Sequence, residues 1–204
     1  MTPSPSSPSP ATKAERTRAA LLDAVDAIAL RDGADAVTTT AVTRACGLSV
    51  GTFYRYFPDR EAALGAAFDR ASGELHRRWF GALDGLDRAS PAEAGRRMMD
   101  AHAALLDEVE AYVPLLDAVR RVRPVAAQDA QRDARAQSAV FAERLGIELT
   151  PDNAVRIHVL RTVTGTLTMH YALAAGAERR RLHAEIVRIA SQAVEAMRAD
   201  APAG

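Results

Sequence analysis

The chain has 204 residues, of which 48% are hydrophobic and 25% charged, and its formal net charge is zero. This length suffices for one ordinary domain or two small ones with a real hydrophobic core. The balanced charge excludes a globally basic nucleic-acid binder, so any DNA contact must come from a local patch. The single cysteine, Cys46, excludes an internal disulfide and a cysteine-based zinc site, and it predicts a reducing cytoplasm.

The first ten residues, MTPSPSSPSP, contain four prolines and four serines. They lack the basic and apolar regions of a signal peptide, so residues 1–12 are expected to be a disordered tail. The most hydrophobic segment, residues 155–175, is interrupted by arginines and histidines, and no run of about 18 apolar residues occurs anywhere. We therefore expect no membrane span.

Apolar residues recur at three- and four-residue spacing along the rest of the first third, which predicts helices. Gly33 ends the first helix, Thr38 or Thr39 caps the second, Gly47 ends it, and Pro58 ends the third. The helices expected here cover residues 13–30, 38–46 and 50–57, and a fourth begins near residue 60.

The remainder of the chain also contains helix-start signals. Ser90-Pro91-Ala92-Glu93 places serine at a cap, proline at the first helical position and glutamate where a capping box needs it, and Thr150-Pro151 repeats the cap and proline. No β-strand and no internal repeat is found. The sequence predicts an all-α protein of about nine helices, the later ones over residues 91–110, 114–122, 124–145, 151–175 (ended by Gly176) and 178–197.

The segment from Thr39 to Tyr56 has the spacing of a helix-turn-helix. Two short helices joined by about three residues must cross steeply, and Gly47 allows the turn where a side chain would clash. We expect a small core to set this crossing, formed by Val42, Cys46, Leu48 and Phe53.

The outward face of the second short helix is predicted to carry hydroxyls, aromatic rings and one cation. This set suits phosphate oxygens and base edges and suits a core poorly. Residues 39–60 have a net charge of +2, because three arginines oppose Asp59. Such a modest patch makes dimerisation part of the expected binding. The alternative is that residues 38–60 form a purely structural helical hairpin. The residues predicted on the outward face are Ser49, Thr52, Tyr54, Arg55 and Tyr56.

The run VTTTAVTRACGLSVGTFYRYFPDREAAL, residues 37–64, resembles the DNA-binding domain of the TetR/AcrR family of transcriptional regulators. The match is densest over residues 47–64. The sequence departs from the family pattern at Thr43, where a small alanine is common, at Tyr56, often histidine, and at Arg60, usually lysine. The resemblance implies DNA contacts by Thr38, Thr39, Thr40, Ser49, Val50, Gly51, Thr52, Tyr54, Arg55, Tyr56 and Arg60. Among these, it implies phosphate contacts by Tyr54, Tyr56 and Arg60.

The resemblance also implies a helical ligand-binding and dimerisation domain after the helix-turn-helix domain. The expected division is residues 1–12, 13–60 and 61–200. Apolar stripes on the last two helices predict a two-fold interface between copies. Core packing is the alternative explanation for the larger residues of this domain. The residues assigned to a ligand pocket are Met98, His102, Tyr112, Phe141, Thr162, Thr166, Met169 and His170.

These patterns predict a homodimeric, ligand-responsive repressor that binds a near-palindromic double-stranded DNA operator, with an effector that the sequence does not identify. No cofactor is expected. The histidines show no metal-binding spacing such as HExxH, so no metal site is expected. Cys46 is interpreted as a buried apolar residue, with redox sensing as the alternative. The rival function is an α-helical enzyme or small-molecule-binding protein with an incidental helix-turn-helix. Against an enzyme, no nucleophile elbow or phosphate-binding loop is present.

Overall fold

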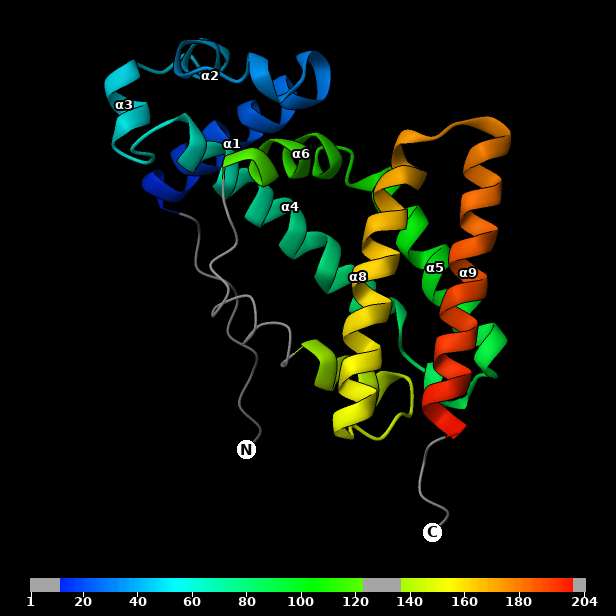
Figure 1. Ribbon diagram of the computed structural model, residues 1–204. Coiled ribbons are helices and arrows are strands. Elements are labelled where there is room, and N and C mark those ends of the chain that lie inside the picture. The colour runs from blue at the N-terminus through cyan, green and yellow to red at the C-terminus, as the bar shows by residue number, and fades with distance from the viewer. Residues whose placement is uncertain (1–11, 123–136, 200–204) are drawn as a thin grey trace, which may run out of the picture. The chain divides into compact units, whose positions relative to one another are not determined.

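The computed structural model describes residues 12–122 and 137–199 (Figure 1), and over these residues the protein contains helices and no strand. The all-α prediction is therefore confirmed. Residues 137–144 are helical, whereas the start of the helix predicted over residues 124–145 and the predicted tail at residues 1–11 lie outside the described part. The other elements are α1 (Lys13–Asp32), η1 (Ala34–Ala36), α2 (Thr39–Cys46), α3 (Val50–Tyr54), α4 (Arg60–Ala82), η2 (Leu86–Arg88), α5 (Pro91–Glu108), α6 (Tyr112–Val122), α8 (Pro151–Leu173) and α9 (Gly176–Ala199).

The predicted caps form where polar side chains can accept from the first turn of a helix. The predicted caps Thr38, Ser90 and Thr150 each accept a hydrogen bond from the backbone N–H three residues on, and Ser49 does the same at the start of α3. At Ser90 only half of a capping box forms, because the Glu93 carboxylate bonds Arg96 instead of the backbone.

The link between the last two helices differs from the prediction. α8 ends at Leu173, and the Ala174 N–H bonds the carbonyl oxygens of His170 and Tyr171. Gly176 has a φ of +54° and begins α9 instead of ending α8. A glycine signals a left-handed backbone but does not say on which side of it the helix lies.

In the described helices, no segment is long and apolar enough to cross a membrane.

The chain divides into two compact units, residues 1–69 with 114–122, and residues 70–113 with 123–204. The sequence predicted a boundary at residue 60, but α4 continues through that point and α6 belongs to the first unit. Buried residues recur every three or four positions along the length of α4. Ala63 and Leu64 lie in the first unit, whereas Leu75 and Trp79 join the core of the second.

The first unit places the two short helices against α1. Contacts join α1 to α2 and α2 to α3. The buried side chains of α1 are Leu21, Leu22, Val25 and Ile28, and Val42 of α2 and Phe53 of α3 are equally buried. Burial of these large side chains stabilises the unit by about 1.5–3 kcal/mol each before entropy is counted.

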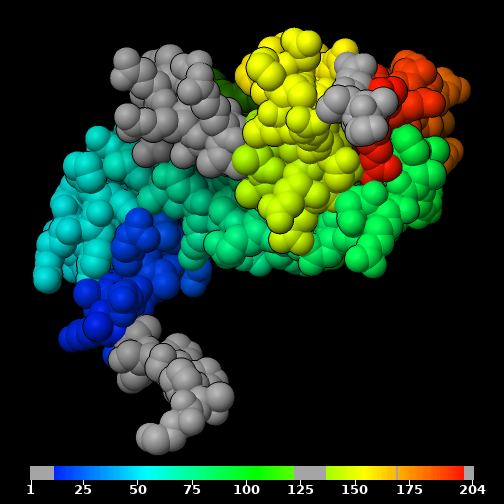
Figure 2. All heavy atoms as spheres, turned by 90° about the horizontal axis from the view of Figure 1, so that it is seen from below, coloured from blue at the N-terminus to red at the C-terminus, as the bar shows by residue number. Residues whose placement is uncertain are grey.

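The second unit is a helical bundle in which α5 and α8 both pack against α9 (Figure 1). Trp79 of α4 stacks on Phe141 with the ring centroids 5.7 Å apart. Gly95 brings α5 and α9 into close approach, since a Cβ built there would lie 2.5 Å from the Ser191 backbone nitrogen. The first turns of α8, coloured yellow, lie at the molecular surface (Figure 2).

Gly95→Ala should destabilise the protein, because the added methyl meets the backbone of α9 at Ser191 as well as the Ser191 hydroxyl, and the backbone cannot move aside as a side chain can. We expect a loss of about 1–3 kcal/mol in the free energy of unfolding, measured by urea denaturation. Gly81→Ala is the matched control, since a Cβ at Gly81 meets nothing within 4 Å. Equal stabilities of the two variants would show that the α5–α9 approach is not tight.

Candidate nucleic-acid interface and ligand pocket

The turn between α2 and α3 depends on the backbone of Gly47. Its φ is +64° and its ψ +30°, the left-handed region that side chains other than glycine rarely adopt. The Gly47 N–H bonds the Arg44 carbonyl at 3.3 Å, and the Leu48 N–H bonds the Thr43 carbonyl at 2.9 Å. A Cβ at Gly47 would meet nothing within 4 Å, so the predicted clash is wrong and the dihedral angle is the reason for the glycine.

The expected core of the two-helix unit is formed by two of its four predicted members. Val42 and Phe53 are buried, whereas Cys46 and Leu48 are only partly buried. The Cys46 thiol donates to the Ala20 carbonyl at 3.2 Å, and burial raises the pKa of the thiol, with a further contribution from Asp23. A protonated thiol is a poor nucleophile, which agrees with a packing role.

Thr43, the departure from the family pattern, is accommodated without an unpaired polar group. Its side chain is buried, and its hydroxyl donates to the Thr39 carbonyl at 2.8 Å. The hydrogen-bonding need of the hydroxyl is met inside α2.

One face of α3 is exposed and combines apolar, aromatic and cationic groups. Val50 is 45% and Tyr54 54% exposed, and Gly51 and Arg55 are exposed beside them. No ion pair or hydrogen bond of the Arg55 side chain occurs within the described residues. Residues 51, 54 and 55 share a face by helical spacing. Arg55 is thus a free cation on an exposed surface.

Ser49 and Thr52 are linked at the start of this face. The Ser49 hydroxyl accepts from the Thr52 N–H at 3.1 Å, and the two hydroxyl oxygens lie 2.9 Å apart. One hydroxyl proton is used between them, which leaves the other free to donate to an outside acceptor.

The N-terminal turn of α2 is partly capped. The Thr38 hydroxyl accepts from the Ala41 N–H at 3.1 Å. The N–H groups of Thr39 and Thr40 have no acceptor within residues 12–122 and 137–199, so they can bind an anion. Arg44, which the sequence did not single out, is a second exposed cation that has no ion-pair partner in this part of the chain.

Comparison with known proteins identifies this arrangement. Residues 21–67 match the model of a family described as bacterial regulatory proteins, tetR family. Over 64 residues the chain is 41% identical to the HTH-type transcriptional repressor KstR of Mycolicibacterium smegmatis (strain ATCC 700084 / mc(2)155). The helix-turn-helix domain of this chain is thus similar in sequence to that of TetR-family regulators. The aligned stretch covers 29% of this chain and 31% of KstR, about a third of that relative.

Solved structures extend the likeness to the fold of the whole chain. A protein of Mesorhizobium loti MAFF303099 assigned to the TetR family has a TM-score of 0.65 at 20% identity, covering 93% of this chain and 98% of that one. A TetR-family transcriptional regulator from Streptomyces coelicolor has a TM-score of 0.64 at 19% identity, covering 88% and 98%. At these identities the likeness is one of fold.

Arg60, predicted as a phosphate ligand, is bonded to the protein in this domain. Its Nε donates to the Val37 carbonyl at 2.5 Å and its Nη2 to the Ala34 carbonyl at 2.8 Å. Asp35 lies 3.7 Å and Glu61 3.4 Å from the same guanidinium. The side chain is 29% exposed. The contact of Arg60 with a phosphate stays a prediction. In this structure the guanidinium binds backbone carbonyls of the protein itself. Tyr56, the other predicted phosphate ligand beyond α3, is partly buried.

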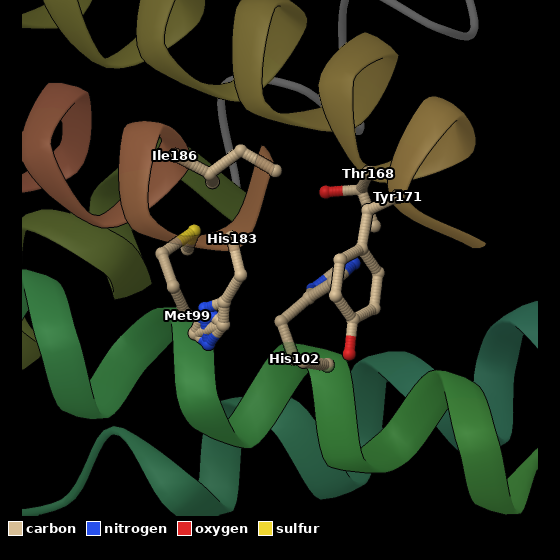
Figure 3. A pocket seen from close by; sticks show the side chains of 7 residues that line it. Met99, His102, Thr168, Tyr171, His183 and Ile186 are labelled. Atoms are coloured by element: carbon tan, nitrogen blue, oxygen red, sulfur yellow. The ribbon is translucent and has the colours of Figure 1, made fainter. Parts of the chain in front are cut away.

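The second unit contains an inner pocket between α5, α8 and α9 (Figure 3). Met99 and His102 reach into it from α5, Thr168 and Tyr171 from α8, and His183 and Ile186 from α9. Desolvation lowers the pKa of His102 to about 4, with a smaller contribution from the nearby His76. The His102 imidazole is therefore neutral at pH 7. Its ring forms an edge contact with Trp79 at 5.7 Å.

The structure brings one of the eight predicted ligand residues, His102, to this pocket. Met98 and Phe141 are fully buried core residues, and Tyr112 packs against the same core. Thr162, Thr166 and His170 are exposed on another face of α8. Met169 lies on α8, and its side chain falls outside the described atoms. Tyr171, Thr168 and His183 carry no sequence signal that separates them from ordinary bundle residues. Within the described residues, no group of histidines, cysteines and carboxylates could hold a metal ion.

Arg60→Ala should lower stability, because the Val37 carbonyl loses its donor and the Ala34 carbonyl keeps only the Val37 N–H. We expect a loss of about 1–3 kcal/mol in the free energy of unfolding, measured by urea denaturation. The matched control is Arg55→Ala, which removes an exposed cation and should leave stability within about 0.5 kcal/mol of the parent. If Arg60→Ala were as stable as Arg55→Ala, the guanidinium would not hold η1.

Proposed function

We propose that this protein is a homodimeric, sequence-specific DNA-binding regulator of transcription, acting as a repressor, whose affinity for DNA responds to a small ligand. The observation that carries the proposal is the exposed face of α3. Val50, Gly51, Tyr54 and Arg55 are presented there on a backbone whose crossing is set by Gly47.

A mechanism follows for the contact with DNA. α3 enters the major groove, where Thr52 and Arg55 meet base edges and Tyr54 and Tyr56 donate to phosphates. The free N–H groups at the start of α2 bind a phosphate on the flank of the groove. Gly51 has no side chain, which lets the backbone of α3 approach the DNA closely. Arg60 stabilises this surface indirectly, because it binds the carbonyls of Ala34 and Val37 in the segment just before α2.

A surface on α8 supports dimerisation. Val155, Val159 and Val163 are 62%, 52% and 38% exposed and recur at four-residue spacing. Thr162, Thr166 and His170 continue this exposed face. By contrast, the apolar stripe of α9 is used within the chain, since Ile186, Ala190, Val194 and Met197 are buried. A second copy packed on the α8 face would cover the valines and place two copies of α3 on the two half-sites of a near-palindrome.

The ligand response is a shift between two arrangements. The ligand binds the second unit more tightly in one arrangement of the protein and therefore increases the population of that arrangement. DNA binds the other arrangement more tightly. Linkage then requires DNA and ligand to weaken each other's binding by the same factor.

The proposal is tested first by selecting DNA with the full chain from a library of random double-stranded oligonucleotides. Enrichment of a near-palindromic site, bound in gel-shift assays despite excess unrelated DNA, is the expected result. Absence of any enriched sequence would contradict sequence-specific binding.

Gly51→Ala should separate stability from DNA binding. A Cβ at Gly51 would meet only the Ser49 hydroxyl, at 3.9 Å, so the fold accepts it and helix propensity stabilises the variant by about 0.5–1 kcal/mol. Affinity for the selected site should fall about tenfold or more, because the methyl stands between α3 and the groove. Gly81→Ala is the control, with unchanged affinity. Undiminished DNA binding by Gly51→Ala would remove this face of α3 from the interface.

Val159→Glu should convert the dimer into a monomer, because it buries a charge without a partner in the proposed interface. The measurement is sedimentation equilibrium, with Val140→Glu as the control for a valine that is also exposed. Affinity for the two-half-site DNA should fall with the dimer. A Val159→Glu protein that remained as dimeric as the control would place the interface elsewhere.

A further inference from the structure

We infer that the ligand of the second unit is a small organic anion, whose charged group binds Arg179 and Arg180 and whose apolar body reaches toward His102. This deepens the proposed function, since it names the ligand class for the ligand response.

A second, wider pocket opens beside the inner one. It measures about 920 Å³ including space open to solvent, and the inner pocket about 230 Å³. Tyr171 and His183 line both, so the two are neighbouring parts of one site. We call the wider part the outer pocket, and its further lining includes Asp107, Gly176, Arg179 and Arg180.

The outer pocket offers positive charge and free donors. The Arg179 guanidinium lies over the Tyr171 ring, 4.4 Å from its centroid, and its Nε is buried without an acceptor. Arg180 is exposed and has no ion-pair partner within residues 12–122 and 137–199. The first N–H groups of α9, at Gly176 and Ala177, also have no acceptor in that part of the chain. An anion would meet all three kinds of donor.

Acidic side chains at or beside the outer pocket already bind some of its donors, and an incoming anion has to compete with them. Asp107 bonds Arg179 and raises the pKa of its guanidinium, and Asp100 accepts from His183 at 2.9 Å. Glu178 is exposed in the first turn of α9 but does not line the pocket. Among the arginines and carboxylates that line the outer pocket, Arg179 and Arg180 against Asp107 leave one positive charge in excess. Asp100 does not line the outer pocket and also pairs with Arg96 at 3.3 Å. An incoming carboxylate therefore competes with Asp107 for Arg179 and meets Arg180 without competition.

The inner pocket suits the uncharged end of such a molecule. Met99, Ala103 and Ile186 supply apolar walls, and no arginine, lysine or carboxylate side chain lines it. The neutral His102 has no hydrogen-bond partner among the described residues, so a ligand group can bind its ring nitrogens. The Thr168 hydroxyl already donates to the Thr164 carbonyl and can only accept. Tyr171 and His183, which line both pockets, lie where the two meet, so a ligand that enters the inner pocket passes between or beside them.

The test compares three probes that share one alkyl chain and differ in head group, namely octanoate, 1-octanol and octylammonium. Binding to the full chain is followed by calorimetry and by the fluorescence of Trp79, the single tryptophan, whose ring lies 5.7 Å from that of His102. Octanoate should bind saturably and at least about tenfold more tightly than the other two. Equal binding of 1-octanol, tighter binding of octylammonium, or no saturable binding of octanoate at millimolar concentration would each overturn the inference.

Three variants assign the binding to this pocket. Arg179→Gln should weaken octanoate about tenfold, and Asp107→Asn should strengthen it several-fold by freeing Arg179. Arg188→Gln is the matched control, because Arg188 lies on the same helix and is paired with Glu185 away from the pocket. Its octanoate affinity should stay within about twofold of the parent. Asp107→Asn keeps the test valid if Arg179→Gln folds poorly, and an unchanged affinity in Asp107→Asn would overturn the inference.

Failure of this inference and failure of the proposed function can be told apart. DNA selection in the absence of any probe tests the regulator and is independent of the pocket. Octanoate binding that depends on Arg179, in a protein that selects no DNA, would support the ligand class and contradict the regulator.

Discussion

The placement of the DNA-facing helices depends on a guanidinium that donates to two backbone carbonyls. Arg60, the first residue of α4, bonds the oxygens of Ala34 and Val37, directly before the Thr38 cap of α2. The Ala34 carbonyl also accepts from the Val37 N–H at 3.2 Å, whereas no backbone N–H of the described residues donates to the Val37 carbonyl, which therefore depends on Arg60. Asp35 lies 3.7 Å from Arg60 and 3.7 Å from Arg121 of α6, so the same place joins η1, α4 and α6 within the first unit.

The polar groups of the two-helix unit divide between those used within the protein and those left free. Thr38 and Ser49 cap their helices, and the hydroxyl of Thr43 bonds the backbone of α2. What remains unsatisfied is the set that faces outward, namely one hydroxyl proton of the Ser49–Thr52 pair, the N–H groups that begin α2, and the Arg55 side chain. These outward-facing donors determine the specificity of the proposed interface, because each is held in place by the protein and its hydrogen-bond acceptor has to come from the DNA.

The second unit uses α8 on two sides. Ile157 and Leu160 are buried in the bundle, and Thr168 and Tyr171 line the pocket. The side that carries Val155, Val159 and Val163 stays exposed. A ligand that contacts Tyr171 therefore contacts the helix that also carries the proposed interface between copies. Under the proposed function, α8 is the element through which such a ligand would act on the dimer.

The sequence by itself determined the helices, their caps and the helix-turn-helix, because these depend on residues within one or two turns of each other, as in Thr38–Ala41 and Gly47. It also predicted the exposure of Ser49, Tyr54 and Arg55, whereas Thr52 and Tyr56, predicted on the same outward face, are partly buried. Tertiary structure alone decided that Arg60 binds carbonyls 23 and 26 residues earlier in the chain, and that Gly95 approaches Ser191. It likewise placed Thr162 and Thr166 outside the pocket and Tyr171 and His183 inside it. Periodicity shows that a helix has faces, but the neighbour that each face meets depends on how distant helices pack, which no local pattern encodes.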